Sequence, residues 1–201
     1  MRKDGGRPAM RKEGLGPAMG GRSAMGRYLI FALFWFMGSK GVAQSTFQPV
    51  DKLSIVQFNI KNLGFKVTGS FSGVSGKIVF DPAQPGNALF DVTVDAASVN
   101  TDNSMRDDHL HKESFFDVEH FPKIRVVSDK IAFHRNGAYL FSGKLTIKGH
   151  TKDISFPFTV AQVEGGYRFK GAFSVNRSDF DIGGFSTMSD QSEISLDVTA
   201  K

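Results

Sequence analysis

The chain has 201 residues, a formal net charge of +5 and no cysteine. Residues 1–43 hold eight Lys and Arg against two Asp and Glu, so this segment alone carries +6. The whole-chain +5 less this +6 leaves −1 for residues 44–201, which excludes the strongly basic surface of a nucleic-acid-binding protein. Without cysteine there is neither a disulfide nor a lipid-modified cysteine anchor, so stability must come from the core.

Residues 1–43 have the pattern of a secretory signal peptide. A ten-residue apolar run, residues 28–37, follows basic residues, and small residues stand at positions −3 and −1 of a cut before Gln44. The run is too short to span a membrane, which needs about 20 residues. We therefore predict cleavage before Gln44, export of the remaining chain, and no stable membrane insertion afterwards. Met25 is an alternative start, because a leader beginning there would have an ordinary length.

Residues 44–201 are predicted to form one domain of strands, because apolar and polar residues alternate along them. Period-two alternation indicates strands with one dry and one wet face. It is clearest at 90–94, 139–147, 154–160, 167–175 and 194–198, with further strand-like runs at 55–61, 65–71 and 77–80. Turn residues separate these runs, and Asn136-Gly137 is the strongest two-residue hairpin signal. Without covering helices, about eight to ten antiparallel strands must close into a sandwich or a barrel.

Inward-facing aromatic residues follow from the same alternation. Side chains two positions apart share a face of a strand, so the phenylalanines on the apolar positions should all point into the interior. These are Phe141, Phe156, Phe158, Phe169 and Phe173. Tyr139 and Tyr167 share this parity but begin their strands, so we expect them near one barrel end with their hydroxyls in water.

One segment, residues 96–122, breaks the alternation and is predicted to be a structured excursion with one or two helical turns. It raises the question of a metal site, because His109 and His111 stand two apart, with His120 further on. The segment does not alternate like a strand, so the two histidines would not share a face, and we expect no metal and no cofactor. No nucleophile motif accompanies the acids beside His109, so we expect no catalytic residues.

The charged residues of the excursion are interpreted instead as a structural clasp formed by Arg106, Asp107 and His109. The planar guanidinium of Arg106 can bind Asp107, Asp108 or backbone carbonyls and so hold a long segment in place. The adjacent Phe115-Phe116 either plugs one barrel end or forms the mouth of an apolar cavity.

Several motifs resemble the YceI-like family, and they occur in the same order along residues 47–200. They are T-x-N-x-x-R-D-x-H-L at 101–110, FFDV at 115–118, FPKI at 121–124, GKLTIKGHTK at 143–152 and NRSDF at 176–180. The resemblance implies an extended eight-stranded antiparallel barrel, similar to a lipocalin, that binds polyisoprenoid or similar lipids inside. It also implies no general enzymatic activity and export into the periplasm, whereas the signal peptide alone would equally allow a secreted protein.

The predicted function is therefore an exported carrier or sequesterer of an isoprenoid or other long-chain lipid. The expected ligand-binding residues are Phe58, Phe71, Phe115, Phe116, Phe141, Phe156, Phe158, Phe169 and Phe173. Two alternatives stay open: an enzyme acting on a lipid-like substrate through His109 and its neighbouring acids, and a structural barrel without a ligand. A homodimer is also left open.

Overall fold

The structure is a computed structural model that describes residues 45–184 and 187–201. The predicted signal peptide, residues 1–43, and its alternative start at Met25 lie outside the described residues. Within the described part, no helix has the length and apolar character needed to cross a membrane.

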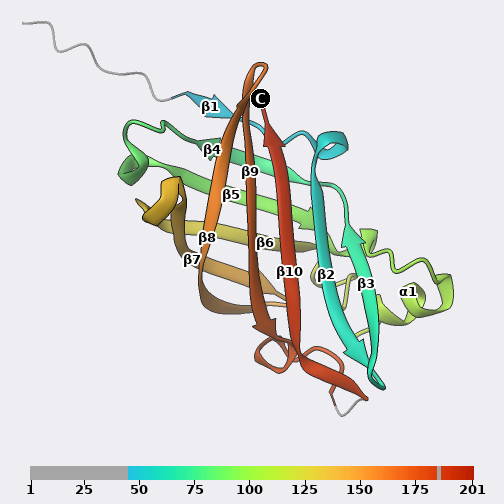
Figure 1. Ribbon diagram of the computed structural model, residues 1–201. Coiled ribbons are helices and arrows are strands. Elements are labelled where there is room, and N and C mark those ends of the chain that lie inside the picture. The colour runs from blue at the N-terminus through green and yellow to red at the C-terminus, as the bar shows by residue number, and fades with distance from the viewer. Residues whose placement is uncertain (1–44, 185–186) are drawn as a thin grey trace, which may run out of the picture. The chain divides into compact units, whose positions relative to one another are not determined.

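Ten strands form one antiparallel sheet in the described residues (Figure 1). They are β1 (Thr46–Phe47), β2 (Ile55–Asn62), β3 (Phe65–Phe71), β4 (Ser75–Val79), β5 (Leu89–Asp95), β6 (Lys123–Phe133), β7 (Tyr139–Ile147), β8 (His150–Val163), β9 (Gly166–Asn176) and β10 (Met188–Ala200). Their order is β1-β4-β5-β6-β7-β8-β9-β10-β2-β3, so most neighbours in space are neighbours in sequence. The predicted all-β antiparallel class is confirmed, with ten strands where the resemblance implied eight.

Within residues 45–184 and 187–201, one α-helix and five short 3-10 helices connect the strands. They are α1 (Ser104–Leu110), η1 (Asp51–Leu53), η2 (Pro85–Asn87), η3 (Ala96–Ser98), η4 (Arg135–Gly137) and η5 (Arg177–Phe180). The helix α1 begins after Asn103, whose side-chain oxygen accepts a hydrogen bond from the Arg106 backbone N–H at 3.0 Å. The predicted excursion with one or two helical turns is thus confirmed.

The sheet curls into a half-barrel, and each of its two edges makes a short pairing with another part of the chain. Just after β1, Pro49 pairs with Ala200 at the end of β10, so this segment bridges β4 and β10. At the other edge, Ser70 of β3 pairs with Asn100 in the excursion. Because these pairings are brief, no continuous ladder joins the two edges of the sheet within the described residues.

Alternation did not reveal β6, and a β-bulge explains why. The register with β7 shifts between Ser128 and Lys130, so one extra residue reverses the parity of inward and outward side chains. Val126 lies on the inner face before the bulge, and the fully buried Ile131 lies there after it. A constant period of two therefore cannot describe the whole strand.

The predicted turn at Asn136-Gly137 has the expected backbone. Both residues have positive φ, 58° and 73°, as the two central residues of a type I′ hairpin turn require. The expectation of a two-residue connection was wrong, however, since the last β6–β7 pair is Phe133 with Tyr139 and residues 134–138 lie between them.

Candidate functional site

The interior contains an apolar cavity of about 220 Å³. Its walls come from the inward-facing side chains of β2 to β10 together with residues of α1 and η5. An apolar cavity of roughly 150 Å³ stays dry and takes up apolar guests, so a larger one with such walls suits a hydrocarbon better than water.

All nine phenylalanines expected to contact a ligand line this cavity. The five assigned by strand parity all face the interior, although Phe173 is only half-buried. The expectation missed two further lining aromatics, Phe90 and Phe180. Phe90 lies on the alternating positions of its strand, and Phe180 ends the NRSDF motif, so both carried a signal in the sequence.

One end of the interior is filled by aromatic side chains rather than hollow. Phe80 is 1 % exposed and packs edge-on against Tyr139, Tyr167 and Phe169, with ring centroids 5.4 Å apart in each case. Tyr139 is only 7 % exposed, and its burial raises the pKa of the phenol. The two tyrosines thus lie at the same end as expected, and Tyr139 is buried there. That their hydroxyls are in water stays a prediction.

The other end is closed by the excursion. Phe116 packs edge-on against Phe71 of β3 at 5.4 Å, and both Phe115 and Phe116 are buried. The same two residues also line the cavity. The two alternatives for this pair are therefore compatible, because the side chains plug the end and form its inner wall.

A clasp holds the excursion, but its centre is Thr101, which the sequence interpretation did not include. Arg106 donates from Nε to Thr101 Oγ1 and from Nη2 to the Thr101 carbonyl, both at 2.7 Å. Thr101 Oγ1 in turn donates to Asp107 Oδ1 at 2.5 Å, and the Thr101 backbone N–H donates to the same oxygen. Arg106 and Asp107 are thus joined through a buried threonine rather than directly.

His109 takes no part in that hydrogen-bond network. Its ring lies against Phe115, with centroids 4.8 Å apart, and the residue is exposed and is not among the residues that line the cavity. The prediction that His109 belongs to the clasp was therefore wrong, since none of the clasp hydrogen bonds involves it. The enzyme alternative requires His109 to face the interior, and the position of His109 does not support it.

The three histidines of the excursion each have a separate environment. The Nε2 atom of His111 lies 3.0 Å from the Ala97 carbonyl, and His120 Nδ1 lies 2.8 Å from Asp117 Oδ1. The hydrogen bond and the charge of Asp117 raise the pKa of His120. Among the residues that the structure describes, no three His, Cys, Asp or Glu side chains are grouped so as to hold a metal ion.

Arg177 forms a second clasp that sequence reasoning missed. Its guanidinium donates to the carbonyls of Ile182 at 2.6 Å, Gly184 at 3.0 Å and Ser189 at 3.2 Å. Arg177 also lines the cavity, as Arg106 does. The NRSDF motif marked the position, but the partners are backbone atoms and leave no pattern in the sequence.

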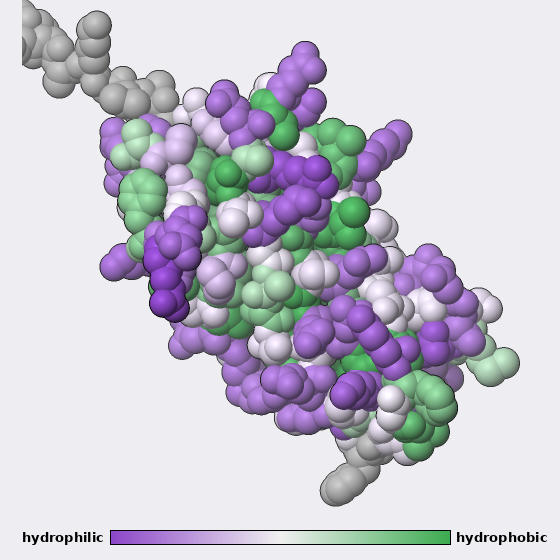
Figure 2. Space-filling model, viewed as in Figure 1, coloured by the Kyte–Doolittle hydropathy of each residue, from purple (hydrophilic) through white to green (hydrophobic). Residues whose placement is uncertain are grey.

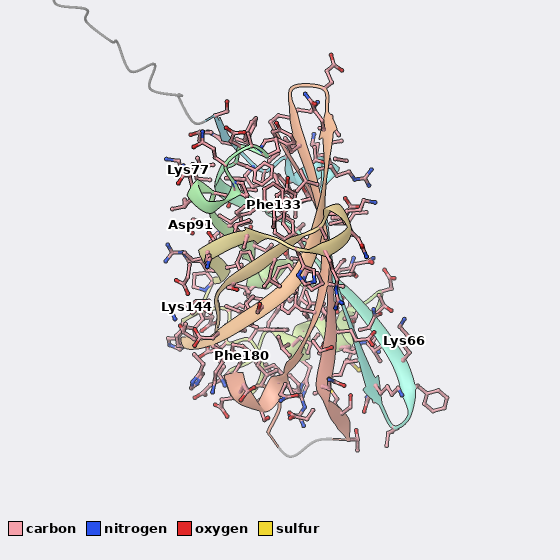
Figure 3. All side chains as sticks on the ribbon, turned by 60° about the vertical axis from the view of Figure 1, so that its left-hand side comes forward. Lys66, Lys77, Asp91, Phe133, Lys144 and Phe180 are labelled. Atoms are coloured by element: carbon pink, nitrogen blue, oxygen red, sulfur yellow. The ribbon has the colours of Figure 1, made fainter. Side chains whose placement is uncertain are left out.

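Many charged side chains lie on the outer face, as Figure 3 shows for Lys77, Asp91 and Lys144. Arg125 binds Asp91 with both Nε and Nη2, at 2.8 and 2.7 Å. This hydrogen bonding lowers the pKa of Asp91. The structure thus separates a polar outer surface from an almost wholly apolar interior.

Comparison with known proteins agrees with this architecture. The YceI-like domain matches residues 47–200. The chain belongs to the YceI-like family. Among its relatives, a UPF0312 protein of Pseudomonas fluorescens is 34 % identical over 139 residues, which are 63 % of this chain and 70 % of the relative.

Two solved structures show the same fold as this YceI-like protein. Burkholderia cenocepacia BcnA has a TM-score of 0.71 and 29 % identity, covering 75 % of this chain and 98 % of that one. A polyisoprenoid binding domain from Saccharophagus degradans, implicated in plant cell wall breakdown, has a TM-score of 0.62 and 14 % identity. That match covers 79 % of this chain and 98 % of the domain, and it shows the shared fold.

Proposed function

We propose that this protein binds the hydrocarbon chain of a polyisoprenoid or similar long-chain lipid in its interior, as a carrier or sequesterer rather than as an enzyme. The observation that carries the proposal is the apolar cavity of about 220 Å³ walled by phenylalanines. Membership of the YceI-like family and the fold shared with a polyisoprenoid binding domain support it.

The driving force would be the transfer of methylene groups out of water. Each buried CH₂ contributes about 0.8 kcal/mol, so ten methylenes would contribute roughly 8 kcal/mol before the entropy of ordering the chain is subtracted. An apolar wall discriminates weakly between chains that differ by one methylene. We therefore propose selection by length and girth.

Export is part of the same proposal. Cleavage before Gln44 would release residues 44–201 into the periplasm or the medium, where a free lipid chain needs protection from water. Intact-mass measurement of the exported protein tests this, since a species that keeps residues 28–37 in the membrane fraction would contradict it.

The binding proposal is tested by filling the cavity. Val175 lines it from β9, whereas its neighbour Ser174 lies on the exposed face. Val175→Phe should abolish binding of a fluorescent polyene fatty acid supplied in solution, and lipid extracted from the purified variant should fall well below the stoichiometric amount expected from the wild type. Ser174→Phe adds the same ring outside and should leave both measurements unchanged. Equal binding by both variants, or wild-type extracts without lipid, would refute the proposal.

A further inference from the structure

The tip of the β2–β3 hairpin is built against the ordinary preferences of a hairpin. Asn62 pairs with Phe65, so the turn consists of Leu63 and Gly64. Leu63 has a φ of 50°, in the left-handed region that leucine disfavours and that asparagine or glycine normally fills. The fold alone gives no reason for a leucine here, because its side chain is 70 % exposed.

The charges at this tip are also unfavourable for the isolated protein. Lys61 and Lys66 stand directly opposite each other across the two strands, an arrangement that destabilises a sheet. Residues 55–71 contain no acidic residue, and neither lysine forms an ion pair within the part of the chain that the structure describes. Figure 3 shows Lys66 on this hairpin, away from Phe133.

Two large apolar side chains are exposed between these lysines. Phe65 is 77 % exposed and Leu63 is 70 % exposed, and Figure 2 shows the hydrophobic surface that they form at the hairpin tip. Apolar side chains flanked by lysines match the boundary of an anionic membrane, where the rings enter the acyl region and the ammonium groups meet phosphates.

The same hairpin forms part of the cavity wall. Ile60, Asn62 and Val67 line the cavity from β2 and β3. β3 is the last strand of the sheet, so in the described residues no other strand pairs with its free side near the hairpin tip. A tip inserted into the headgroup region would therefore place this wall of the cavity against the lipid.

We propose that the β2–β3 tip, formed by Lys61, Leu63, Phe65 and Lys66, docks the protein on the surface of an anionic lipid bilayer, from which the cavity exchanges its ligand. This inference rests on the proposed lipid binding. The left-handed backbone at Leu63 and the opposed lysines lower the stability of the free protein, whereas the exposed leucine side chain and the two positive charges become favourable at the membrane.

The test uses two variants that should stabilise the fold while weakening docking. Leu63→Asn relieves the left-handed backbone, and Lys66→Glu places an opposite charge across from Lys61. Both should raise the melting temperature. Both should reduce co-flotation with vesicles of phosphatidylethanolamine and phosphatidylglycerol by at least about tenfold, and Phe65→Ser should do the same.

Matched controls separate the tip from exposure and charge in general. Phe133 is 64 % exposed at another hairpin, and Lys130 is exposed on β6. Phe133→Ser and Lys130→Glu should float with anionic vesicles as the wild type does. All variants are expressed from the full chain, and intact mass establishes that they share one N-terminus.

Binding of the fluorescent fatty acid in solution distinguishes the docking proposal from the proposed lipid binding on which it rests. The tip variants should bind the probe from solution like the wild type but take it up from vesicles at least about tenfold more slowly. Wild-type protein that binds the probe yet does not float, or tip variants that float and load normally, would overturn the docking proposal alone. Docking without any probe binding would overturn the lipid-exchange role together with the proposed function.

Discussion

The two ends of the barrel interior use the same residue type for different purposes. At one end, Phe80 is almost completely buried and contacts Tyr139, Tyr167 and Phe169 edge-on. Toward the other end, the phenylalanines surround a cavity, and Phe116 in the excursion closes it against β3. A phenylalanine on the dry face of a strand can thus belong to a packed core or to a wall, depending on what stands opposite. We call these regions the packed end and the hollow end.

The largest expected effect tests this distinction directly. Phe80→Ala should lower the free energy of unfolding by about 3–5 kcal/mol, because it opens a cavity in a filled aromatic cluster. Phe173→Ala should cost only about 1–2 kcal/mol, since Phe173 is half-buried and already borders empty space. Urea unfolding of the two variants measures the difference, and equal losses would mean that the hollow end is ordinary core.

The hollow end depends on polar contacts, which the second prediction addresses. Arg106→Ala should lower the free energy of unfolding by about 1.5–3 kcal/mol, because Thr101 loses two charge-assisted hydrogen bonds. Arg106→Lys should recover little of this, since lysine lacks the planar fork. Arg135→Ala removes an exposed arginine from the β6–β7 connection and serves as the control. A melting temperature unchanged by Arg106→Ala, together with lost ligand binding, would instead make Arg106 a ligand contact.

Acid should weaken the outer face that covers the packed end. Asp197 accepts hydrogen bonds from Arg168 at 2.6 and 2.7 Å, and these contacts hold its pKa below the ordinary 3.8. The pair therefore contributes its full stability above 3.8, and the contribution is lost as the pH falls through the lowered value. The wild type should lose stability across this range relative to Asp197→Asn, as measured by urea unfolding at each pH. Parallel curves for the two proteins would contradict the assignment.

The smallest effect is expected in the excursion, and it has the opposite sign. The hydrogen bond to Asp117 raises the pKa of His120 above its ordinary 6.5. Its contribution is present below 6.5 and is lost as the pH rises through the raised value. Because the imidazole is well exposed, the change in melting temperature should be small and absent in His120→Gln. Titration of the His120 ring protons by NMR would show a midpoint at or below 6.5 if the interpretation is wrong.

Where the strands follow a constant period, their position could be read from the residues alone. β3 and β7 begin and end where the alternation of residues 65–71 and 139–147 predicts. β6 could not be found this way, because the bulge beside Asp129 reverses the parity within the strand. The clasp shows a similar limit, since Arg106 and Asp107 were evident but the buried Thr101 between them was not.

In the strands with a constant period, the residues alone predict which side chains face inward. A pleated strand turns successive side chains to opposite sides, and the removal of the apolar ones from water is favourable. The residues alone also predict the left-handed turn at Asn136-Gly137. Which inward phenylalanines touch and which border a cavity could not be predicted in this way, because it depends on the curl of the sheet and on the distance between strands far apart in sequence. The same holds for the β2–β3 tip, where the exposure of Leu63 and Phe65 and the opposition of Lys61 and Lys66 follow from the register of the pair.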